Sequence, residues 1–327
     1  MEEHADLLNR RVREGRIVDG HGDVRCESIC VVDGIRLFDC IEFNDRFRCG
    51  DVAGEVAFLA MDLDALGRPD LGYWFAERYR QHSMDGDLFR LLPFYRCYRA
   101  YVRAKVQSFR IDEPEFTDAE RQQAAQKAEM FFDLARRYAT PLPRPAVVVV
   151  AGLSGTGKTT LARAVAAELG VEVVSTDAVR ADLFGQQKRP VPFGEGVYGT
   201  EASRATYSEV VERSRRHIDE YGCVLLDGTF LDPLQREGAR ALAESVGAEF
   251  RLIRCQLSDD AVHDRLERRR QLGDGVSDAC WETYLRQREL RHPSDGDTAE
   301  GMLVLDTSRN LAECSRSACD WLRGTRP

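Results

Sequence analysis

The spacing of apolar residues changes near the middle of the chain. From residue 146 onward, short runs rich in Val, Leu and Ile alternate with longer amphipathic stretches. The apolar runs lie at 146–153, 171–177, 223–230, 249–257 and 302–308, and the amphipathic stretches include 159–170, 233–247 and 259–271. A short continuous apolar run is typical of a strand buried on both faces, and regular alternation with helices is typical of a parallel sheet. This half is therefore predicted to be an α/β domain with a doubly wound parallel sheet.

The first half shows a mostly helical pattern. Helices are predicted near 54–66, 72–82, 87–108 and 117–138, the last with Thr117 as N-cap and Glu120 completing a capping box. Residues 4–20 are expected to form one helix, and the runs 28–33 and 35–43, joined by Asp33 and Gly34, predict a β-hairpin. The prolines of PLPRP fix an extended backbone. The expected organisation is a helical domain at 1–140, a linker at 141–145 and the α/β domain at 146–327.

Composition favours a soluble protein. The net charge of the 327 residues is −9, which weighs against nucleic acid as a partner. No apolar run approaches the roughly 18 residues of a membrane span, and the charged N-terminus lacks the apolar core of an export signal. None of the 10 cysteines lies in a Cys-x-x-Cys pair. Buried reduced thiols at Cys40, Cys97, Cys223 and Cys255 in a cytoplasmic protein are therefore expected, and a zinc site is not.

The strongest chemical motif is GLSGTGKT at 152–159, which fits G-x-x-x-x-G-K-[ST] between a predicted strand and a predicted helix. Its glycines let backbone N–H groups turn toward phosphate oxygens, and the helix adds its positive end. Lys158 is expected to reach the β- and γ-phosphates, and Thr159 to coordinate Mg²⁺. The expected cofactors are ATP and Mg²⁺, and the predicted nucleotide-binding residues are Gly152, Ser154, Gly155, Thr156, Gly157, Lys158, Thr159 and Thr160.

Two carboxylates end predicted strands beside this motif. Asp177 and Arg180 share a face if a helix begins at Asp177. The carboxylate can then orient or deprotonate an acceptor hydroxyl, and Arg180 can hold the acceptor or the moving phosphate. The alternative is that Asp177 caps the helix and Arg180 is a solvated charge. Asp227 ends the apolar run 223–230, where a carboxylate linked to Mg²⁺ belongs in P-loop enzymes, or where it simply caps the junction.

A run of arginines follows the fourth predicted strand. Within HDRLERRR, Arg265 and Arg269 are four residues apart and so lie on one helix face. Arginines on a lid can neutralise charge on a transferred phosphoryl group, although such a run can equally be a solvated face.

Taken together, GLSGTGKTT, STDAVRADL, VLLDGTF and HDRLERRR resemble the P-loop small-substrate kinases, which include gluconate kinases, polynucleotide 5′-kinases and zeta-toxin sugar-nucleotide kinases. The resemblance covers about residues 146–325. It implies Lys158 and Thr159 on ATP and Mg²⁺, Asp177 and Arg180 at the acceptor, and Arg265 or Arg269 at the γ-phosphate. It also implies that DTSRN, at 306–310, contacts adenine.

The first half resembles the C-terminal lobe of aminoglycoside phosphotransferases, in a bacterial fusion with a P-loop ATP-binding protein. HGDVRCES stands where that family has His-Gly-Asp-x-x-x-x-Asn, so the resemblance gives Asp23 as catalytic Asp, Ser28 in place of the metal-binding Asn, and Asp39 as second metal-binding Asp. No ATP-clamping lobe fits into the 20 preceding residues. We therefore expect this half not to assemble its own ATP site, because the chain is a truncated member or the lobe has been lost.

These observations predict a P-loop kinase that transfers the γ-phosphate of ATP to a hydroxyl of a small-molecule acceptor. The alternatives are a nucleotide-dependent regulatory ATPase or switch, and a polynucleotide 5′-kinase. The acidic charge and the absence of basic stripes interleaved with aromatics weigh against the last.

Overall fold

The computed structural model describes residues 5–185, 194–272, 280–290 and 301–324. The chain forms two compact units. Unit 1 comprises Met1–Pro141 with Ala167–Gly170, and unit 2 comprises Leu142–Ala166 with Val171–Pro327.

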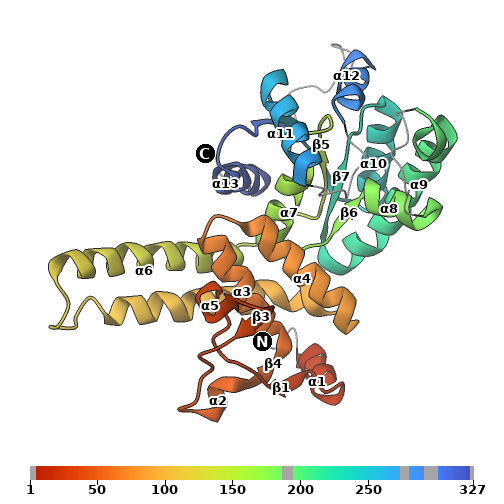
Figure 1. Ribbon diagram of the computed structural model, residues 1–327. Helices are drawn as coiled ribbons and strands as arrows, with labels where there is room; N and C mark the ends of the chain where they lie inside the picture. The colour runs from red at the N-terminus through yellow and green to blue at the C-terminus, as the bar shows by residue number, and fades with distance from the viewer. Residues whose placement is uncertain (1–4, 186–193, 273–279, 291–300, 325–327) are drawn as a thin grey trace. The chain divides into compact units, whose positions relative to one another are not determined.

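Unit 1 is built mainly from helices (Figure 1). They are α1 (Ala5–Arg13), α2 (Asp45–Arg48), α3 (Val52–Ala65), α4 (Pro69–Ser83), α5 (Leu88–Phe109) and α6 (Asp118–Tyr138), with a short 3₁₀ turn at Cys26–Ser28. The predicted capping box of α6 is confirmed, because Thr117 and Glu120 exchange hydrogen bonds. The long helices α5 and α6 pack on each other and on α3 around Phe58, Met61 and Phe131.

Two small antiparallel sheets complete unit 1. The predicted hairpin is confirmed as β2 (Ile29–Val31) and β3 (Ile35–Leu37), and both Asp33 and Gly34 have positive φ in its turn. The prediction of a single helix over 4–20 is wrong. α1 ends at Arg13, Gly15 turns the chain with φ +70°, and β1 (Ile17–Asp19) pairs with β4 (Cys49–Asp51).

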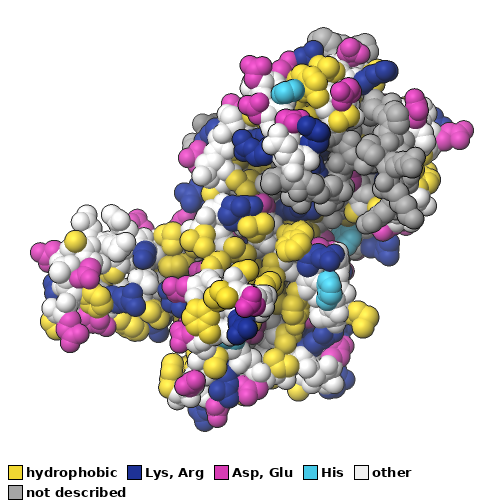
Figure 2. All heavy atoms as spheres, viewed as in Figure 1, with side chains coloured by type: hydrophobic (Ala, Val, Ile, Leu, Met, Phe, Trp, Pro, Cys, Tyr) yellow, Lys and Arg dark blue, Asp and Glu magenta, His cyan; other side chains and the backbone are white. Residues whose placement is uncertain are grey.

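Apolar side chains remain exposed on unit 1. Figure 2 shows hydrophobic side chains along the α5–α6 pair, where Tyr98, Tyr101, Phe109 and Phe132 are exposed. None of the helices in the described part of the chain combines the length and apolar character needed to cross a bilayer.

Unit 2 contains the predicted parallel sheet, which is confirmed. Its five strands lie in the order β6-β7-β5-β8-β9, and all neighbouring pairs are parallel. The strands are β5 (Ala146–Ala151), β6 (Val173–Ser175), β7 (Cys223–Gly228), β8 (Glu249–Gln256) and β9 (Met302–Asp306). Every residue of β5 is buried, which explains its unbroken run of Val.

Helices cover both faces of this sheet, with α9 and α10 on one side and α7 and α13 on the other (Figure 1). The helices of unit 2 are α7 (Lys158–Leu169), α8 (Thr176–Phe184), α9 (Thr200–Tyr221), α10 (Pro233–Ser245), α11 (Asp259–Leu272), α12 (Trp281–Leu290) and α13 (Leu311–Leu322), with a 3₁₀ turn at Gly196–Tyr198. β6 and β7 lie on one side of β5, whereas β8 and β9 lie on the other. In open α/β sheets, ligands bind at such a switch point, outside the carboxyl ends of the strands.

The cysteines are all free thiols. Cys223 and Cys255 are buried as predicted, but the prediction for Cys40 is wrong, since it lies in an exposed loop of unit 1. Cys97 is half-buried.

Candidate active site

The loop between β5 and α7 has the backbone that a phosphate-binding loop requires. Gly155 has φ +80° and Gly157 has φ +85°, values that residues with a Cβ rarely adopt. A Cβ on Gly155 would also lie 2.9 Å from a methyl carbon of Val262. The loop leads directly into the N-terminus of α7 at Lys158, so that free N–H groups and the helix end face the same space.

Distant residues hold this loop in place. The Thr307 hydroxyl, just after β9, donates to the Thr156 carbonyl at 2.7 Å. From α12, the Gln287 Oε1 accepts the Ser154 N–H at 2.8 Å. The sequence analysis did not identify Gln287, because the two partners are 133 residues apart and no local pattern connects them.

Thr159 and Asp227, the two residues predicted to hold Mg²⁺, lie side by side, with the Thr159 hydroxyl donating to the Asp227 Oδ2 at 2.8 Å. The side chain of Asp227 is buried, and its Oδ1 has no hydrogen-bond partner among the described residues. Burial raises the pKa of this carboxyl, while Lys158 and the Thr159 hydroxyl oppose the rise. A buried carboxylate oxygen without a partner beside a threonine hydroxyl matches the hard oxygen ligands that Mg²⁺ prefers. The residues present therefore fit a divalent cation.

Asp177 and Arg180 also meet. α8 begins at Thr176 after Ser175, so Asp177 lies in the first turn and is not the N-cap. Its carboxylate accepts a hydrogen bond from the Arg180 Nη1 at 2.9 Å. The Arg180 side chain is buried, donates to the Val197 carbonyl and lies over the Tyr198 ring. The alternative interpretation of a helix cap and a solvated charge is therefore wrong.

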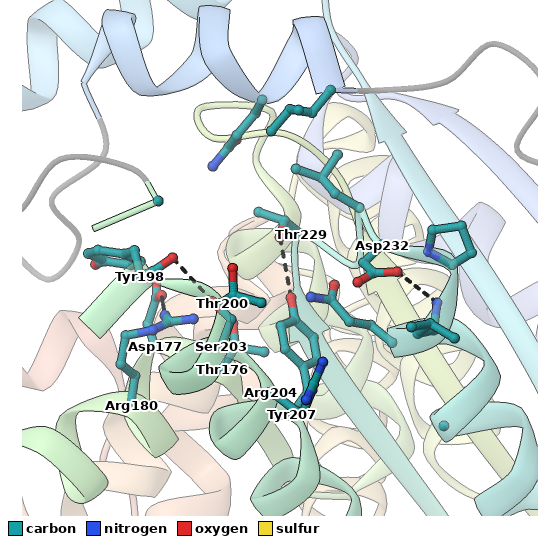
Figure 3. Close-up of a pocket in the computed structure, with 18 of the residues that line it drawn as sticks. Thr176, Asp177, Arg180, Tyr198, Thr200, Ser203, Arg204, Tyr207, Thr229 and Asp232 are labelled. Atoms are coloured by element: carbon teal, nitrogen blue, oxygen red, sulfur yellow. Dashed lines mark hydrogen bonds and ion pairs between the residues drawn. The ribbon is translucent and has the colours of Figure 1, made fainter. Parts of the chain in front are cut away.

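A cavity of about 780 Å³ opens between the phosphate-binding loop and these residues. Its walls come from the loop itself, α8, α9, the β7–α10 segment and α12. Figure 3 shows Asp177, Arg180, Thr200, Ser203 and Tyr207 around it. The lining combines hydroxyl and charged side chains with apolar ones such as Val211, Leu231 and Leu234, so the cavity can hold a ligand that carries hydroxyl groups on an apolar frame. The walls contributed by 229–238 and 283–290 were not predicted.

The β7–α10 segment contains a strained residue. Phe230 has φ +46°, an uncommon conformation for a bulky side chain. Its N–H donates to the Tyr207 hydroxyl at 3.2 Å, and its carbonyl accepts from the Arg236 Nη1 at 2.6 Å. The Tyr207 hydroxyl also lies 3.2 Å from the Thr229 hydroxyl. These contacts fix the loop that lines the cavity after Asp227.

The two arginines predicted at the γ-phosphate lie outside the lining of the cavity. Arg265 donates to the Thr307 carbonyl at 2.6 Å. If Gly157 carried a Cβ, that atom would lie 3.0 Å from the Nη1 of Arg265. Arg265 therefore lies beside the phosphate-binding loop, next to the DTSRN segment, and does not line the cavity. Arg269, one turn further along α11, does not line the cavity either.

In unit 1, the HGD loop and the segment before Asp39 lie together. A ring nitrogen of His21 is 2.8 Å from the Phe38 carbonyl, and the Ser28 hydroxyl donates to the Asp23 carbonyl at 3.2 Å. The Asp23 carboxylate pairs with Arg25 at 2.8 Å. Asp39 is exposed, with φ +63°. Within the described ranges, no group of three or more His, Cys, Asp and Glu side chains is placed to hold a metal ion.

Comparison with known proteins agrees with the fold of unit 2. Residues 147–293 match the family described as "AAA domain". Over 280 residues the chain is 38% identical to uncharacterized proteins of Mycobacterium tuberculosis H37Rv and Mycobacterium bovis. These alignments cover 84% of this chain and 54% of each relative, so the chain spans about half the length of the curated relatives it matches.

Solved kinases are similar to part of the chain. A putative kinase from Chloroflexus aurantiacus is 20% identical with a TM-score of 0.43, covering 56% of this chain and 99% of its own. A sugar kinase from Janibacter is 19% identical with a TM-score of 0.43 (57% and 99%), and a gluconokinase from Sinorhizobium meliloti is 19% identical with a TM-score of 0.39 (56% and 93%). The strand order, the motif in its strand–helix setting and the family match define unit 2 as a P-loop domain.

Proposed function

We propose that unit 2 is an ATP-dependent phosphotransferase that moves the γ-phosphoryl group of ATP to a hydroxyl of a small molecule. One observation carries the proposal: a single cavity is lined by Ser154 and Lys158 from the P-loop and by Asp177 and Arg180 from α8. A site that only binds or hydrolyses nucleotide does not need a cavity of about 780 Å³ that reaches from the P-loop to a carboxylate and an arginine of another helix.

The position of each residue indicates its role in the proposed reaction. Lys158 and the N–H groups of the P-loop bind the phosphates. Asp177 orients the acceptor hydroxyl and takes its proton, and the ion pair with Arg180 fixes the carboxylate for that task. Thr159 and Asp227 would hold Mg²⁺, which when bound supplies positive charge that stabilises the phosphate oxygens.

The size and lining of the cavity support a small acceptor. A volume of about 780 Å³ lies within the roughly 300–1,000 Å³ of small-molecule sites. Thr200, Ser203 and Ser208 add hydroxyl groups on the α9 side. A cavity with this lining favours a polar metabolite over an oligonucleotide, which needs a long basic groove.

We assign no separate reaction to unit 1. The resemblance of residues 1–140 to an aminoglycoside phosphotransferase lobe stays a prediction. The Asp23 carboxylate, the expected proton acceptor there, is engaged by Arg25.

The test is a phosphotransfer screen with γ-labelled ATP and Mg²⁺ against sugars, nucleosides, aminoglycosides and oligonucleotides. We expect label in one class of small hydroxyl compound, and loss of that transfer by about 10²-fold or more in Lys158→Ala, since the phosphate charge is then unmatched. Lys127→Ala, an exposed lysine on α6, is the charge-matched control.

Three results would contradict the proposal. Equal ATP consumption with every acceptor would indicate a regulatory ATPase, and label only in oligonucleotides would indicate a polynucleotide kinase. Transfer abolished by Asp23→Asn but kept in Lys158→Ala would assign the chemistry to unit 1.

A further inference from the structure

Gln287 is a buried polar residue of unit 2 for which the phosphotransfer described above has no role. It lies on α12, its side chain is 4% exposed, and it lines the same cavity as Lys158 and Asp177. Its Oε1 accepts the N–H of Ser154, the third residue of the P-loop motif, at 2.8 Å.

This contact determines how the amide is oriented. A backbone N–H can only donate, so the oxygen of Gln287 faces Ser154 and the NH₂ group is on the opposite arm of the planar amide. No acceptor among the described residues pairs with Nε2. Because the side chain lines the cavity, this free donor is available to a ligand there.

The helix that carries Gln287 is firmly attached. Tyr284, one turn earlier on α12, is buried in an apolar cluster with Leu153, Val262 and Leu266. Its hydroxyl donates to the Asp259 Oδ1 at 2.6 Å at the start of α11. The amide therefore needs little reorganisation to act, which is the condition under which a neutral donor contributes most to catalysis.

We propose that Gln287 is a catalytic residue whose Nε2 donates to an oxygen of the phosphoryl group in transit. The inference rests on the proposed function. In that step the acceptor oxygen attacks the γ-phosphorus, the bond from phosphorus to the β,γ-bridging oxygen breaks with its electrons staying on ADP, and the hydroxyl proton passes to Asp177. Gln287 is assigned to the phosphoryl group because its amide is bonded to the loop that binds phosphates, whereas the acceptor walls belong to α8 and α9.

Two substitutions of Gln287 separate its proposed hydrogen bond to the phosphoryl group from its hydrogen bond to the P-loop. Gln287→Glu keeps an oxygen for the Ser154 N–H and removes the donor, while Gln287→Met removes both without adding charge. In both we expect kcat to fall by about 10²-fold, with the KM of the acceptor unchanged. Glu289→Gln, an exposed residue of the same helix, controls for the change of charge on α12 and is expected to retain wild-type kcat.

The readout is steady-state transfer to the acceptor together with hydrolysis of ATP by water and the affinity for ADP. A kcat within threefold of wild type in either variant would overturn the inference. So would a loss explained by weaker ADP binding alone, which would mean that Gln287 only supports the loop. If the wild type hydrolyses ATP but transfers to no acceptor, the proposed function fails, while the hydrolysis rates of the two variants still decide the role of Gln287.

Discussion

At the scale of single residues, unit 2 retains groups that burial disfavours. Asp227 is buried with one oxygen that no described residue pairs with, and Phe230 has a left-handed backbone conformation. Both are unfavourable for folding and both adjoin the cavity or the P-loop. Such conflicts between local preference and structure concentrate at functional sites, where the strained or desolvated group is ready for a ligand.

Asp227→Asn should make the ligand-free protein more stable and less active. Burial raises the pKa of Asp227, so the ionised carboxylate weakens the folded state as pH rises from the ordinary Asp value to the raised value. The amide avoids this loss, and we expect a gain of about 1 kcal/mol, or about 2–4 °C, near neutral pH. Thermal unfolding of both proteins from pH 4 to 8 measures it.

The same substitution should lower Mg²⁺-dependent turnover by at least about 10²-fold, because a neutral amide is a poor ligand for a hard cation. If Asp227→Asn unfolds at a lower temperature than wild type at pH 7 and keeps its turnover, the carboxylate serves the fold and not the metal.

Tyr207→Phe should loosen the β7–α10 loop. Without the hydroxyl, the buried N–H of Phe230 loses its acceptor, a cost of about 1–3 kcal/mol. Thr229 and the residues after it should then hold the acceptor less well, so the acceptor KM should rise while the KM for ATP does not.

Steady-state kinetics and chemical denaturation give the two quantities for Tyr207→Phe. Tyr101→Phe, with a half-exposed ring on α5, is the control and should match wild type in both. An unchanged acceptor KM would show that the loop is fixed by its backbone alone.

At the scale of elements, the P-loop depends on the backbone conformation of its glycines as well as on side chains. Gly157 has φ +85° and precedes α7, and Gly222 has φ +68° at the end of α9. Both are left-handed, but only the first adjoins the predicted phosphate site, and a Cβ on the second would meet nothing within 4 Å. Gly222 can therefore serve as the control for a substitution of Gly157, since both have a left-handed backbone.

Gly157→Ala should abolish nucleotide binding, whereas Gly222→Ala should only cost about 1 kcal/mol of stability. In the first, relief of strain turns the N–H groups away from the phosphates and the new methyl group crowds Arg265. Calorimetry with ADP and Mg²⁺ distinguishes them; equal affinities in the two variants would contradict the assigned loop.

The elements that the sequence predicted are those set by neighbouring residues. The runs of Val and Leu predicted the strands of the sheet, and the motif 152–159 predicted its loop. The β1–β4 pairing was missed because each strand has three residues and the partners lie about 30 residues apart. Gln287 was missed for the same reason, and Thr307, although it lies in the segment predicted to contact adenine, was not expected to anchor the P-loop, since both contacts span more than 100 residues.

At the scale of the whole molecule, folding divides the ten thiols into three exposed, three half-buried and four buried ones. Cys40, Cys49 and Cys280 are exposed, while Cys223, Cys255, Cys314 and Cys319 are buried. Burial raises the pKa of Cys223 and of Cys255 to about 12, so neither forms a thiolate at neutral pH.

A thiol reagent at pH 8 should therefore modify the three exposed cysteines first and the four buried ones only in denaturant. Mass spectrometry of the labelled peptides identifies each site. Rapid modification of Cys223 or Cys255 in the native protein would mean that the sheet of unit 2 opens readily.

The hydrogen bond between Thr307 and Thr156 joins residues 151 positions apart. A ribosome makes the P-loop early and the residue that fastens it much later, at about 5–20 residues per second. Until β9 and Thr307 have emerged, β8 has a bare edge and the loop lacks its last anchor. Competence to bind nucleotide is thus acquired only after residue 307 has been made, and a nascent chain stalled before residue 302 has the motif but not the complete site.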